Sequence, residues 1–459
     1  MVEFYIKGGL VHPSTPPLSR LGGRATVWRM GLSARLKASA VDVLLGEGLI
    51  EAQRRIHRVV GAGRLEMYHQ LDDAHSYLLL QVLPRLLDAD PSLSLELFVV
   101  PAAERSVDPE PERRRRYAIR DAAEIAERFD VIFPRDAELP SEELVRTAEA
   151  ILGVGRPARE QLDAALEVTA ALWHGDREEL RRLETSRGTS GDAAGELVAT
   201  ARLQRRRGHY QGAMIRYGGV WHWGLDRLDV LADALAMDGH DVPLPLLTRR
   251  PDAPQVQAPE ADALELFFSF RSPYSYLALE RVAGLASRYG IPLVIKPVLP
   301  MVMRGHAVPL VKRLYLARDA AQQARRLGIP FGKICDPLGV GVERCLALFG
   351  HAEAQGAALA FCASAARGIW AEAIDVTRDD EMALVVRRAG LDWSEAKGSL
   401  DDESWRERVE EYRLELRDTG LYGVPSFRLG EVAYWGQDRL DRLEEHLQAW
   451  AAARSRRLS

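Results

Sequence analysis

Residues 264–282 read LELFFSFRSPYSYLALERV, and this stretch joins a strand to a helix through a Ser-Pro turn. Residues 264–270 are mostly apolar and β-prone, which predicts a buried strand. Residues 273–288 carry the apolar spacing of a helix. Ser272 and Pro273 are strong residues for the N-cap and the first position of that helix. Many α/β folds place a reactive group at such a turn, where a strand ends and a helix begins.

The chain repeats itself once. Residues 208–228 align with residues 420–440 without a gap, and ten of the 21 positions are identical. Unrelated segments of average composition would share only about one or two. Two further pairs of similar segments occur in the same order. Residues 65–83 resemble 264–282, and residues 116–129 resemble 314–327. Two long copies indicate a duplicated domain, because a solenoid would consist of several shorter repeats.

The second copy has the order β-α-β, a helical block, and β-β-α. After its first helix we expect a strand at 290–298, several helices within 308–416, a hairpin turning at Gly430-Glu431 and a helix at 437–453. This is a thioredoxin-like order with helices inserted after the second strand. The sequence therefore predicts an α/β fold of tandem thioredoxin-like domains, each with a helical insertion.

The two copies divide the chain into four segments. They are an N-terminal extension at 1–60, a degenerate copy at 61–240, a linker at 241–262 and the second domain at 263–459. The linker is assigned from its high proline content. The extension matches neither copy, and we expect a helix over its residues 33–60.

Three separated motifs of the second copy resemble the 2-hydroxychromene-2-carboxylate isomerases. These enzymes belong with the kappa-class glutathione transferases in the DsbA-like thioredoxin superfamily. The motifs are FFSFRSPYSYLA (267–278), RGIWAEAIDV (367–376) and YGVPSFRLGEVAYWGQDRL (422–440), with a weaker match at 312–331. The resemblance covers residues 263–452. It implies DsbA-like domains, glutathione as cofactor, a small aromatic substrate, and isomerase or transferase-like activity.

The resemblance also implies roles for individual residues. In that family the serine of the Ser-Pro turn faces the sulfur of bound glutathione. A Val-Pro turn with a cis proline binds the tripeptide backbone, and an aspartate after the last hairpin helps to hold the γ-glutamyl end. The matching residues are Ser272 as the catalytic residue, Val424 and Pro425, and Asp438 with Gln437 beside it. Weaker candidates for the substrate pocket are Tyr274, Lys312 and Trp370.

Elementary chemistry supports these roles. A helix N-terminus stabilises a nearby thiolate, whereas a free thiol is mostly protonated at neutral pH. The Ser272 hydroxyl can donate a hydrogen bond to sulfur. A cis peptide at Val424-Pro425 would leave the N–H and C=O of Val424 free for an extended ligand. Asp438 could accept a hydrogen bond from the ligand's α-ammonium group.

Simpler structural roles exist for the same residues. Ser272 could serve only as a helix cap, and Asp438 could be a first-turn carboxylate that favours the helix dipole. Aromatic residues are more often core than ligand platforms. This alternative applies to Tyr274, Tyr276, Trp370, Tyr434 and Trp435.

Cysteine usage argues against dithiol exchange. A DsbA-type redox protein needs C-x-x-C at the start of the first helix, and this chain has SPYS there. Cys335, Cys345 and Cys362 have no disulfide or metal-ligand spacing, so we expect small apolar residues in a reducing cytoplasm and no metal site.

The first copy departs from the glutathione pattern. It has Asp73-Ala74 at the Ser-Pro position and Gly212-Ala213 at the Val-Pro position. A carboxylate facing the sulfur would disfavour a thiolate, and an X-Ala bond has no cis tendency. We therefore expect a degenerate partner that forms an intramolecular pseudo-dimer with the second copy.

Bulk composition limits the partners. A net charge of −5 argues against a broad nucleic-acid surface. No stretch approaches the apolar length of a membrane span, and the N-terminus lacks a secretory signal pattern. A second hypothesis remains open, a non-catalytic DsbA-like protein for binding or assembly. Arg271 and residues 332–343, which depart from the isomerase pattern, favour it.

Overall fold

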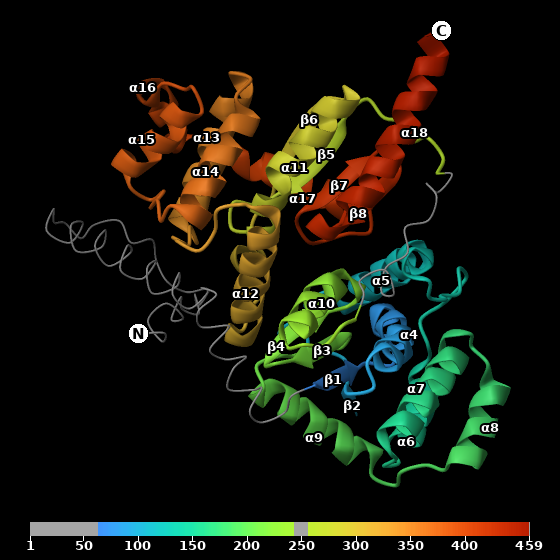
Figure 1. Cartoon of the computed structure of the whole chain (residues 1–459). Coiled ribbons are helices and arrows are strands. Elements are labelled where there is room, and N and C mark those ends of the chain that lie inside the picture. Colours follow the sequence, from blue (N-terminus) through green and yellow to red (C-terminus); the bar gives the residue numbers. More distant parts are fainter. Residues whose placement is uncertain (1–62, 243–255, 459) are drawn as a thin grey trace, which may run out of the picture. The chain divides into compact units, whose positions relative to one another are not determined.

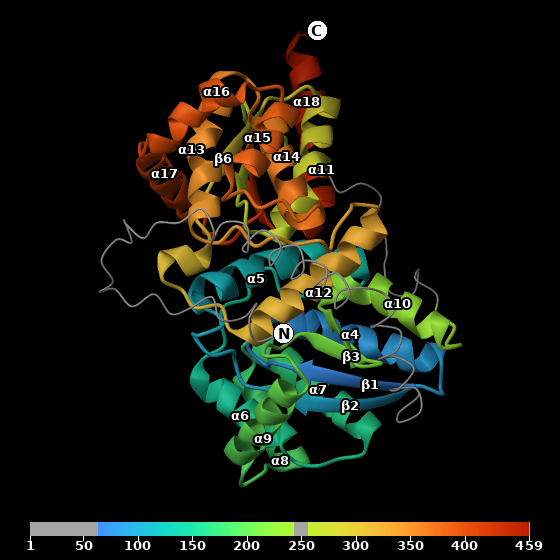
Figure 2. The ribbon, with the colours of Figure 1, turned by 90° about the vertical axis from the view of Figure 1, so that its left-hand side faces the viewer.

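The computed structural model describes residues 63–242 and 256–458. These residues form two compact units, one on each side of the undescribed segment 243–255. The expected helix at 33–60 and most of the expected linker lie outside the described residues. Figure 1 colours the chain along its sequence, and Figure 2 shows the same ribbon turned by 90°.

The N-terminal unit has two parallel strands, a block of helices and a closing hairpin. Its elements are β1 Arg64–His69, α4 Ala74–Ala89, β2 Ser94–Val99, α5 Pro111–Ile125, η1 Ala126–Phe129, α6 Glu142–Leu152, α7 Ala158–Trp173, α8 Arg177–Arg187, α9 Ala193–Arg206, β3 Met214–Tyr217, β4 Val220–Trp223, η2 Leu225–Arg227 and α10 Leu228–Met237.

The C-terminal unit repeats this order. Its elements are β5 Leu264–Phe268, α11 Pro273–Tyr289, β6 Leu293–Pro297, η4 Met301–Arg304, α12 Leu310–Leu327, α13 Val340–Ala354, α14 Ala358–Ala371, α15 Asp379–Arg388, α16 Trp393–Ala396, η5 Lys397–Asp401, α17 Trp405–Asp418, β7 Ser426–Leu429, β8 Val432–Trp435, η6 Gln437–Arg439 and α18 Leu440–Leu458. The predicted order of strands and helices is confirmed for this unit.

Each unit contains a four-stranded sheet with the same pattern of neighbours. The orders are β2-β1-β3-β4 and β6-β5-β7-β8. In each sheet the first strand pairs in parallel with the second and antiparallel with the hairpin. The carboxyl end of β5, and the Ser-Pro turn that follows it, therefore lies at the sheet's centre rather than at an edge strand.

The two faces of the C-terminal sheet have different chemistry. Leu264, Leu266 and Phe268 belong to the apolar core together with α11, and α11 lies beside α14 and α18 (Figure 2). Side chains alternate along a strand, so Glu265 faces the other side. There it meets Lys296 of β6, which also contacts Glu415 of α17.

Several element boundaries differ from the prediction. The strand expected at 290–298 is the shorter β6, Leu293–Pro297, and the last helix ends at Leu458 rather than at residue 453. Strand β5 ends at Phe268 rather than Phe270, because the Phe270 carbonyl accepts a hydrogen bond from the Trp370 indole instead of a strand partner. The last helix begins at Leu440, after a short 3-10 turn. Among the five aromatic residues with a possible core role, Tyr276, Trp370 and Tyr434 are buried, whereas Tyr274 and Trp435 are half-buried.

Candidate functional site

The Ser-Pro turn forms the N-terminus of α11. Ser272 is its N-cap, and its hydroxyl oxygen accepts a hydrogen bond from the Ser275 N–H at 3.1 Å. The Ser272 carbonyl accepts from the Tyr276 N–H at 3.2 Å. The predicted cap is therefore confirmed, and the half-buried Ser272 side chain lies at the positive end of a 17-residue helix.

The Val-Pro turn lies against Ser272. The Val424-Pro425 peptide is cis, as expected, and the Ser272 hydroxyl donates to the Val424 carbonyl oxygen at 3.3 Å. The expectation that this carbonyl is free is therefore wrong for this structure. The Pro425 carbonyl in turn accepts from the Gly436 N–H at 2.9 Å, which connects the turn to the end of the last hairpin.

Three consecutive residues at the Ser-Pro turn, 270–272, are each held by a different part of the chain. The Trp370 indole N–H donates to the Phe270 carbonyl at 3.1 Å. The Arg271 guanidinium makes a two-point ion pair with Asp336 at 2.7 and 2.8 Å. Ser272 contacts Val424. Trp370 is buried, so its contact with the turn is a supporting one.

Gln437 and Asp438 belong to a polar chain that reaches α11. The Arg281 guanidinium donates to the Gln437 side-chain oxygen at 2.5 Å, and the Gln437 amide donates to the Asp438 carboxylate. Burial lowers the pKa of Arg281, although the carboxylates of Asp438 and Asp441 act in the opposite direction. Sequence reasoning missed Arg281, because nothing local links it to a residue 156 positions away.

Tyr274 connects the start of α11 to α12. Its hydroxyl donates to the buried Asp319 carboxylate at 2.6 Å. Lys312 lies on the same helix two turns before Asp319, on the same side. The weak substrate-pocket candidates thus differ in their surroundings, since Tyr274 is bonded to Asp319 while Trp370 supports the turn.

At the matching turn of the N-terminal unit, charged side chains of the same unit pair with one another. Asp73 caps α4 and accepts from the Ser76 N–H at 3.1 Å. Arg114 of α5 pairs with Asp73 at 2.9 Å and with Asp108 at 2.6 Å. Burial opposes ionisation of Asp73, but Arg114 and His75 outweigh it, and the pKa of Asp73 is lowered.

Other matched positions of the two units also differ. The alignment of the two copies pairs His75 with Tyr274 and Asp121 with Asp319. The His75 ring lies 2.7 Å from the Asp121 carboxylate. At the Val-Pro position, Gly212 lies so close to Gln70 that an added Cβ would come within 2.3 Å of the Gln70 Cβ. Both key turns of the N-terminal unit are therefore packed differently.

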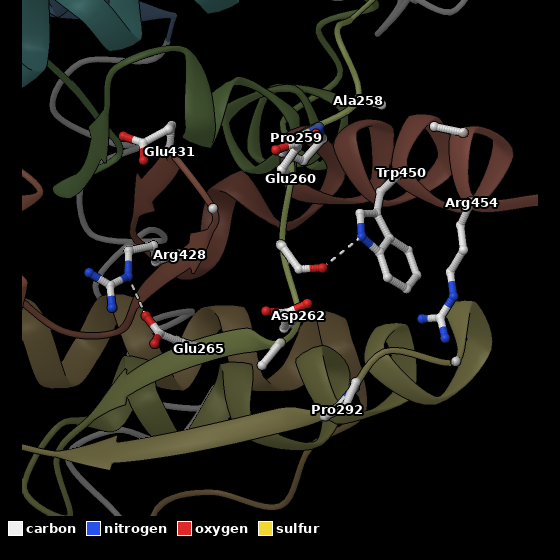
Figure 3. A pocket seen from close by; sticks show the side chains of 15 residues that line it. Ala258, Pro259, Glu260, Asp262, Glu265, Pro292, Arg428, Glu431, Trp450 and Arg454 are labelled. Atoms are coloured by element: carbon white, nitrogen blue, oxygen red, sulfur yellow. Dashed lines mark hydrogen bonds and ion pairs between the residues drawn. The ribbon is translucent and has the colours of Figure 1, made fainter. Parts of the chain in front are cut away.

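A separate cavity of about 960 Å³ lies at the opposite end of β5, where the strand begins (Figure 3). Residues of the segment 258–263 line it, together with the β7–β8 hairpin and Trp450 of α18. The Trp450 indole donates to the Ala261 carbonyl at 3.0 Å. None of the candidate site residues lines this cavity, so the cavity is not part of the candidate site at the Ser-Pro turn.

None of the three cysteines lies at the start of α11. Cys345 and Cys362 are fully buried, and burial raises the pKa of Cys345 to about 12. Cys335 is half-buried in the segment between α12 and α13. Among residues 63–242 and 256–458 there is no group of three or more His, Cys, Asp or Glu suited to a metal ion. In the same part of the chain, no helix is both long and apolar enough to span a bilayer.

The C-terminal unit matches known proteins. The DSBA-like thioredoxin domain model matches residues 263–448. The 2-hydroxychromene-2-carboxylate isomerase of Pseudomonas putida is 30% identical over 189 residues, which are 39% of this chain and 92% of that protein. The isomerase of Sphingobium xenophagum is 28% identical over 196 residues, 40% of this chain and 97% of that protein.

A solved structure of a 2-hydroxychromene-2-carboxylate isomerase is 28% identical, covering 43% of this chain and 99% of its own, with a TM-score of 0.37. The motifs that carry the resemblance, the cis Val-Pro turn and the family match all fall in the same unit. Through its C-terminal unit, the chain belongs to the 2-hydroxychromene-2-carboxylate isomerase group of the DsbA-like thioredoxin family.

Proposed function

We propose that the C-terminal unit is a glutathione-dependent isomerase of the 2-hydroxychromene-2-carboxylate type, or a transferase-like enzyme with the same site. Its substrate would be a small aromatic keto acid. The isomerase relatives support the reaction class. The observation that carries the proposal is the contact between the Ser272 hydroxyl, at the N-terminus of α11, and the cis Val424-Pro425 turn at 3.3 Å.

The residues present suit a γ-glutamyl tripeptide with a thiol. The positive end of α11 and a hydroxyl donor suit a thiolate. The backbone of Val424 suits an extended peptide. Asp438, half-buried at the start of the last helical segment, suits the α-ammonium group of the γ-glutamyl end. The Gly436–Pro425 hydrogen bond at 2.9 Å links these last two positions.

When bound, glutathione would supply a thiolate that adds reversibly to a conjugated double bond, which lets that bond rotate before the thiolate leaves. The contribution of Ser272 is to hold the charged form of the thiol. A hydroxyl has one proton, so Ser272 must release the Val424 carbonyl to donate to sulfur. That exchange is favourable, because a hydrogen bond to an anion is stronger than one to a neutral carbonyl at 3.3 Å.

A dithiol mechanism fits this turn poorly. Ser272 and Ser275 occupy the places where a DsbA-type protein needs cysteines. The fully buried Cys345 and Cys362 have raised pKa values, which makes them poor thiolates. A reducing cytoplasm, where glutathione is abundant and thiols stay free, suits the proposal. So does a small-molecule partner rather than nucleic acid, given the net charge of −5.

For the N-terminal unit we propose a non-catalytic role as a degenerate copy in an intramolecular pseudo-dimer. Its strand order supports a duplicated origin. The Asp73 carboxylate, neutralised by Arg114, stands where Ser272 stands in the other unit. A second candidate function for the whole chain is that of a DsbA-like binding or assembly protein. In that case neither unit would be catalytic.

Titration calorimetry separates these proposals. Wild type should bind glutathione at millimolar concentration or below, and Ser272→Ala should weaken binding at neutral pH about tenfold. S-methylglutathione, which has no ionisable thiol, should bind both proteins equally. Isomerisation of 2-hydroxychromene-2-carboxylate should fall with Ser272→Ala. The absence of glutathione binding to wild type would favour the non-catalytic alternative. Unchanged binding and turnover in Ser272→Ala would instead refute the role proposed for Ser272.

A further inference from the structure

Two departures from the isomerase pattern meet in the folded chain. Arg271 directly precedes Ser272, where a smaller or apolar residue is expected. Asp336 lies in residues 332–343, the other departure. The Arg271 Nε lies 2.7 Å from one oxygen of Asp336, and its Nη2 lies 2.8 Å from the other. The two side chains are 15% and 33% exposed, so the pair is only partly screened by water.

The segment that carries Asp336 is anchored along its length. The Gly332 N–H donates to the Trp370 carbonyl at 3.0 Å, and the Cys335 N–H donates to the Ile369 carbonyl at 2.9 Å. The Tyr276 hydroxyl donates to the Pro330 carbonyl at 2.8 Å. The Asp336 carboxylate also accepts from the Leu338 N–H at 3.2 Å, which fixes its direction. A rigid segment therefore presents a fixed acceptor to Arg271.

We propose that Arg271 and Asp336 form a positioning pair, which ties segment 330–338 to the Ser272 turn and balances the charge beside the thiol-binding position. The proposal rests on the proposed glutathione site. A planar guanidinium and a carboxylate make two parallel bonds, which fix orientation as well as distance. The pair connects residues 65 positions apart, and it acts on Ser272 through the neighbouring backbone.

Charge balance gives the pair a signature that packing alone does not have. Removing Arg271 leaves the Asp336 carboxylate near the thiol, and like charge disfavours a thiolate. Removing the charge of Asp336 leaves a cation there, which favours a thiolate. The two single variants should therefore move the thiolate equilibrium in opposite directions. The double variant should return it close to the wild-type value.

The test is a pH titration of the thiolate of bound glutathione, followed by its ultraviolet absorbance in the full chain. Arg271→Ala should raise the pKa of the bound thiol by about half a pH unit, and Asp336→Asn should lower it by a similar amount. Arg271→Lys keeps the charge but loses the two-point geometry, so it should weaken glutathione binding about threefold while leaving that pKa unchanged.

Arg344→Ala is the matched control. Arg344 pairs with Asp379 at 2.7 Å and is 17% exposed, but it lies on α13 within the helical insertion. The Arg344→Ala variant should lose about as much thermal stability as Arg271→Ala does, but it should leave the pKa of the bound thiol unchanged. The positioning pair is refuted if Arg271→Ala and Asp336→Asn leave the pKa of the bound thiol unchanged, as the control does, or shift that pKa in the same direction. Either result would leave glutathione binding by the wild type intact. If wild type binds no glutathione, the proposed function and the pair are both refuted.

Discussion

The hydroxyl of Ser272 lies between two backbone groups, accepting from the Ser275 N–H at 3.1 Å and donating to the Val424 carbonyl at 3.3 Å. One side chain thus caps α11 and bridges to the cis-proline turn. The first role needs only an oxygen acceptor, whereas the second needs a proton. Substitutions can therefore separate the helix cap from the contact to a ligand.

Ser272→Asp should keep the cap and remove the function. Aspartate caps helices as well as serine does, and Asp73 caps α4 in the N-terminal unit. Its carboxylate would repel a thiolate, so glutathione binding should fall at least tenfold with little loss of stability. Ser272→Ala should instead lose about 1 kcal/mol of unfolding free energy. Chemical denaturation and calorimetry on both variants check this, and tight glutathione binding by Ser272→Asp would contradict it.

Much of the fold could be predicted from local pattern. Ser272-Pro273 marks the helix start, and Gly430, with a φ of 60°, marks the hairpin. The local pattern does not predict the end of β5, because the contact of Phe270 with Trp370 joins residues 100 positions apart. A local pattern contains no information about such a partner, and the same limit applies to element boundaries generally.

Asp438→Asn should weaken glutathione binding about tenfold without changing turnover at saturation. The substitution removes the charge that would face the ligand's α-ammonium group, an interaction made equally before and during reaction. KM for glutathione should rise while kcat stays constant. A glutathione analogue without the amino group should bind both proteins alike. A fall in kcat with unchanged KM would instead assign Asp438 to the chemical step.

The candidate site was predictable only in part. The Ser-Pro and Val-Pro turns carry recognisable dipeptides, and the structure brings Ser272 and Val424 into contact. Arg281 was not predictable, because its partner Gln437 is distant in sequence and carries no charge. Arg271 departs from the isomerase pattern in the sequence, but only the folded chain brings it to Asp336.

Glu265→Gln should destabilise the C-terminal unit by about 1–2 kcal/mol. Glu265 lies between two cations. It is 2.7 Å from Lys296, and it contacts Arg428 (Figure 3). Burial would raise the pKa of Glu265, but these partners outweigh it and lower that pKa. Its contribution is therefore present above about pH 4.3 and is lost as the pH falls through the lowered folded value.

Hydrogen–deuterium exchange of peptides covering β5 and β6 measures this loss within the full chain. Glu410→Gln is the control, because Glu410 pairs with Arg413 on one helix turn and is largely exposed. That change should cost less than about 0.5 kcal/mol. Equal effects of the two substitutions would show that the cluster around Glu265 adds nothing beyond an ordinary surface pair.

The N-terminal unit should lose stability in mild acid because of His69. This ring is fully buried between the hydroxyls of Ser76 and Thr169, each at 2.9 Å. Burial lowers the pKa of His69 to about 4, although Asp73 and Ser76 act in the opposite direction. The unfolded chain binds a proton near pH 6.5. Between these two values the unfolded state holds more protons, so stability rises with pH.

The contribution of His69 is therefore complete above about pH 6.5 and is lost progressively towards pH 4, by up to about 3 kcal/mol. Exchange of the β1 amides in the full chain should accelerate over this range, while β5, with Phe268 at the matching position, should change less. His69→Gln offers polar partners to Ser76 and Thr169 but does not titrate, so it should flatten the pH dependence at some cost in stability at neutral pH. An equally steep pH dependence in this variant would mean that another group in the unit, such as Asp73, controls its acid sensitivity.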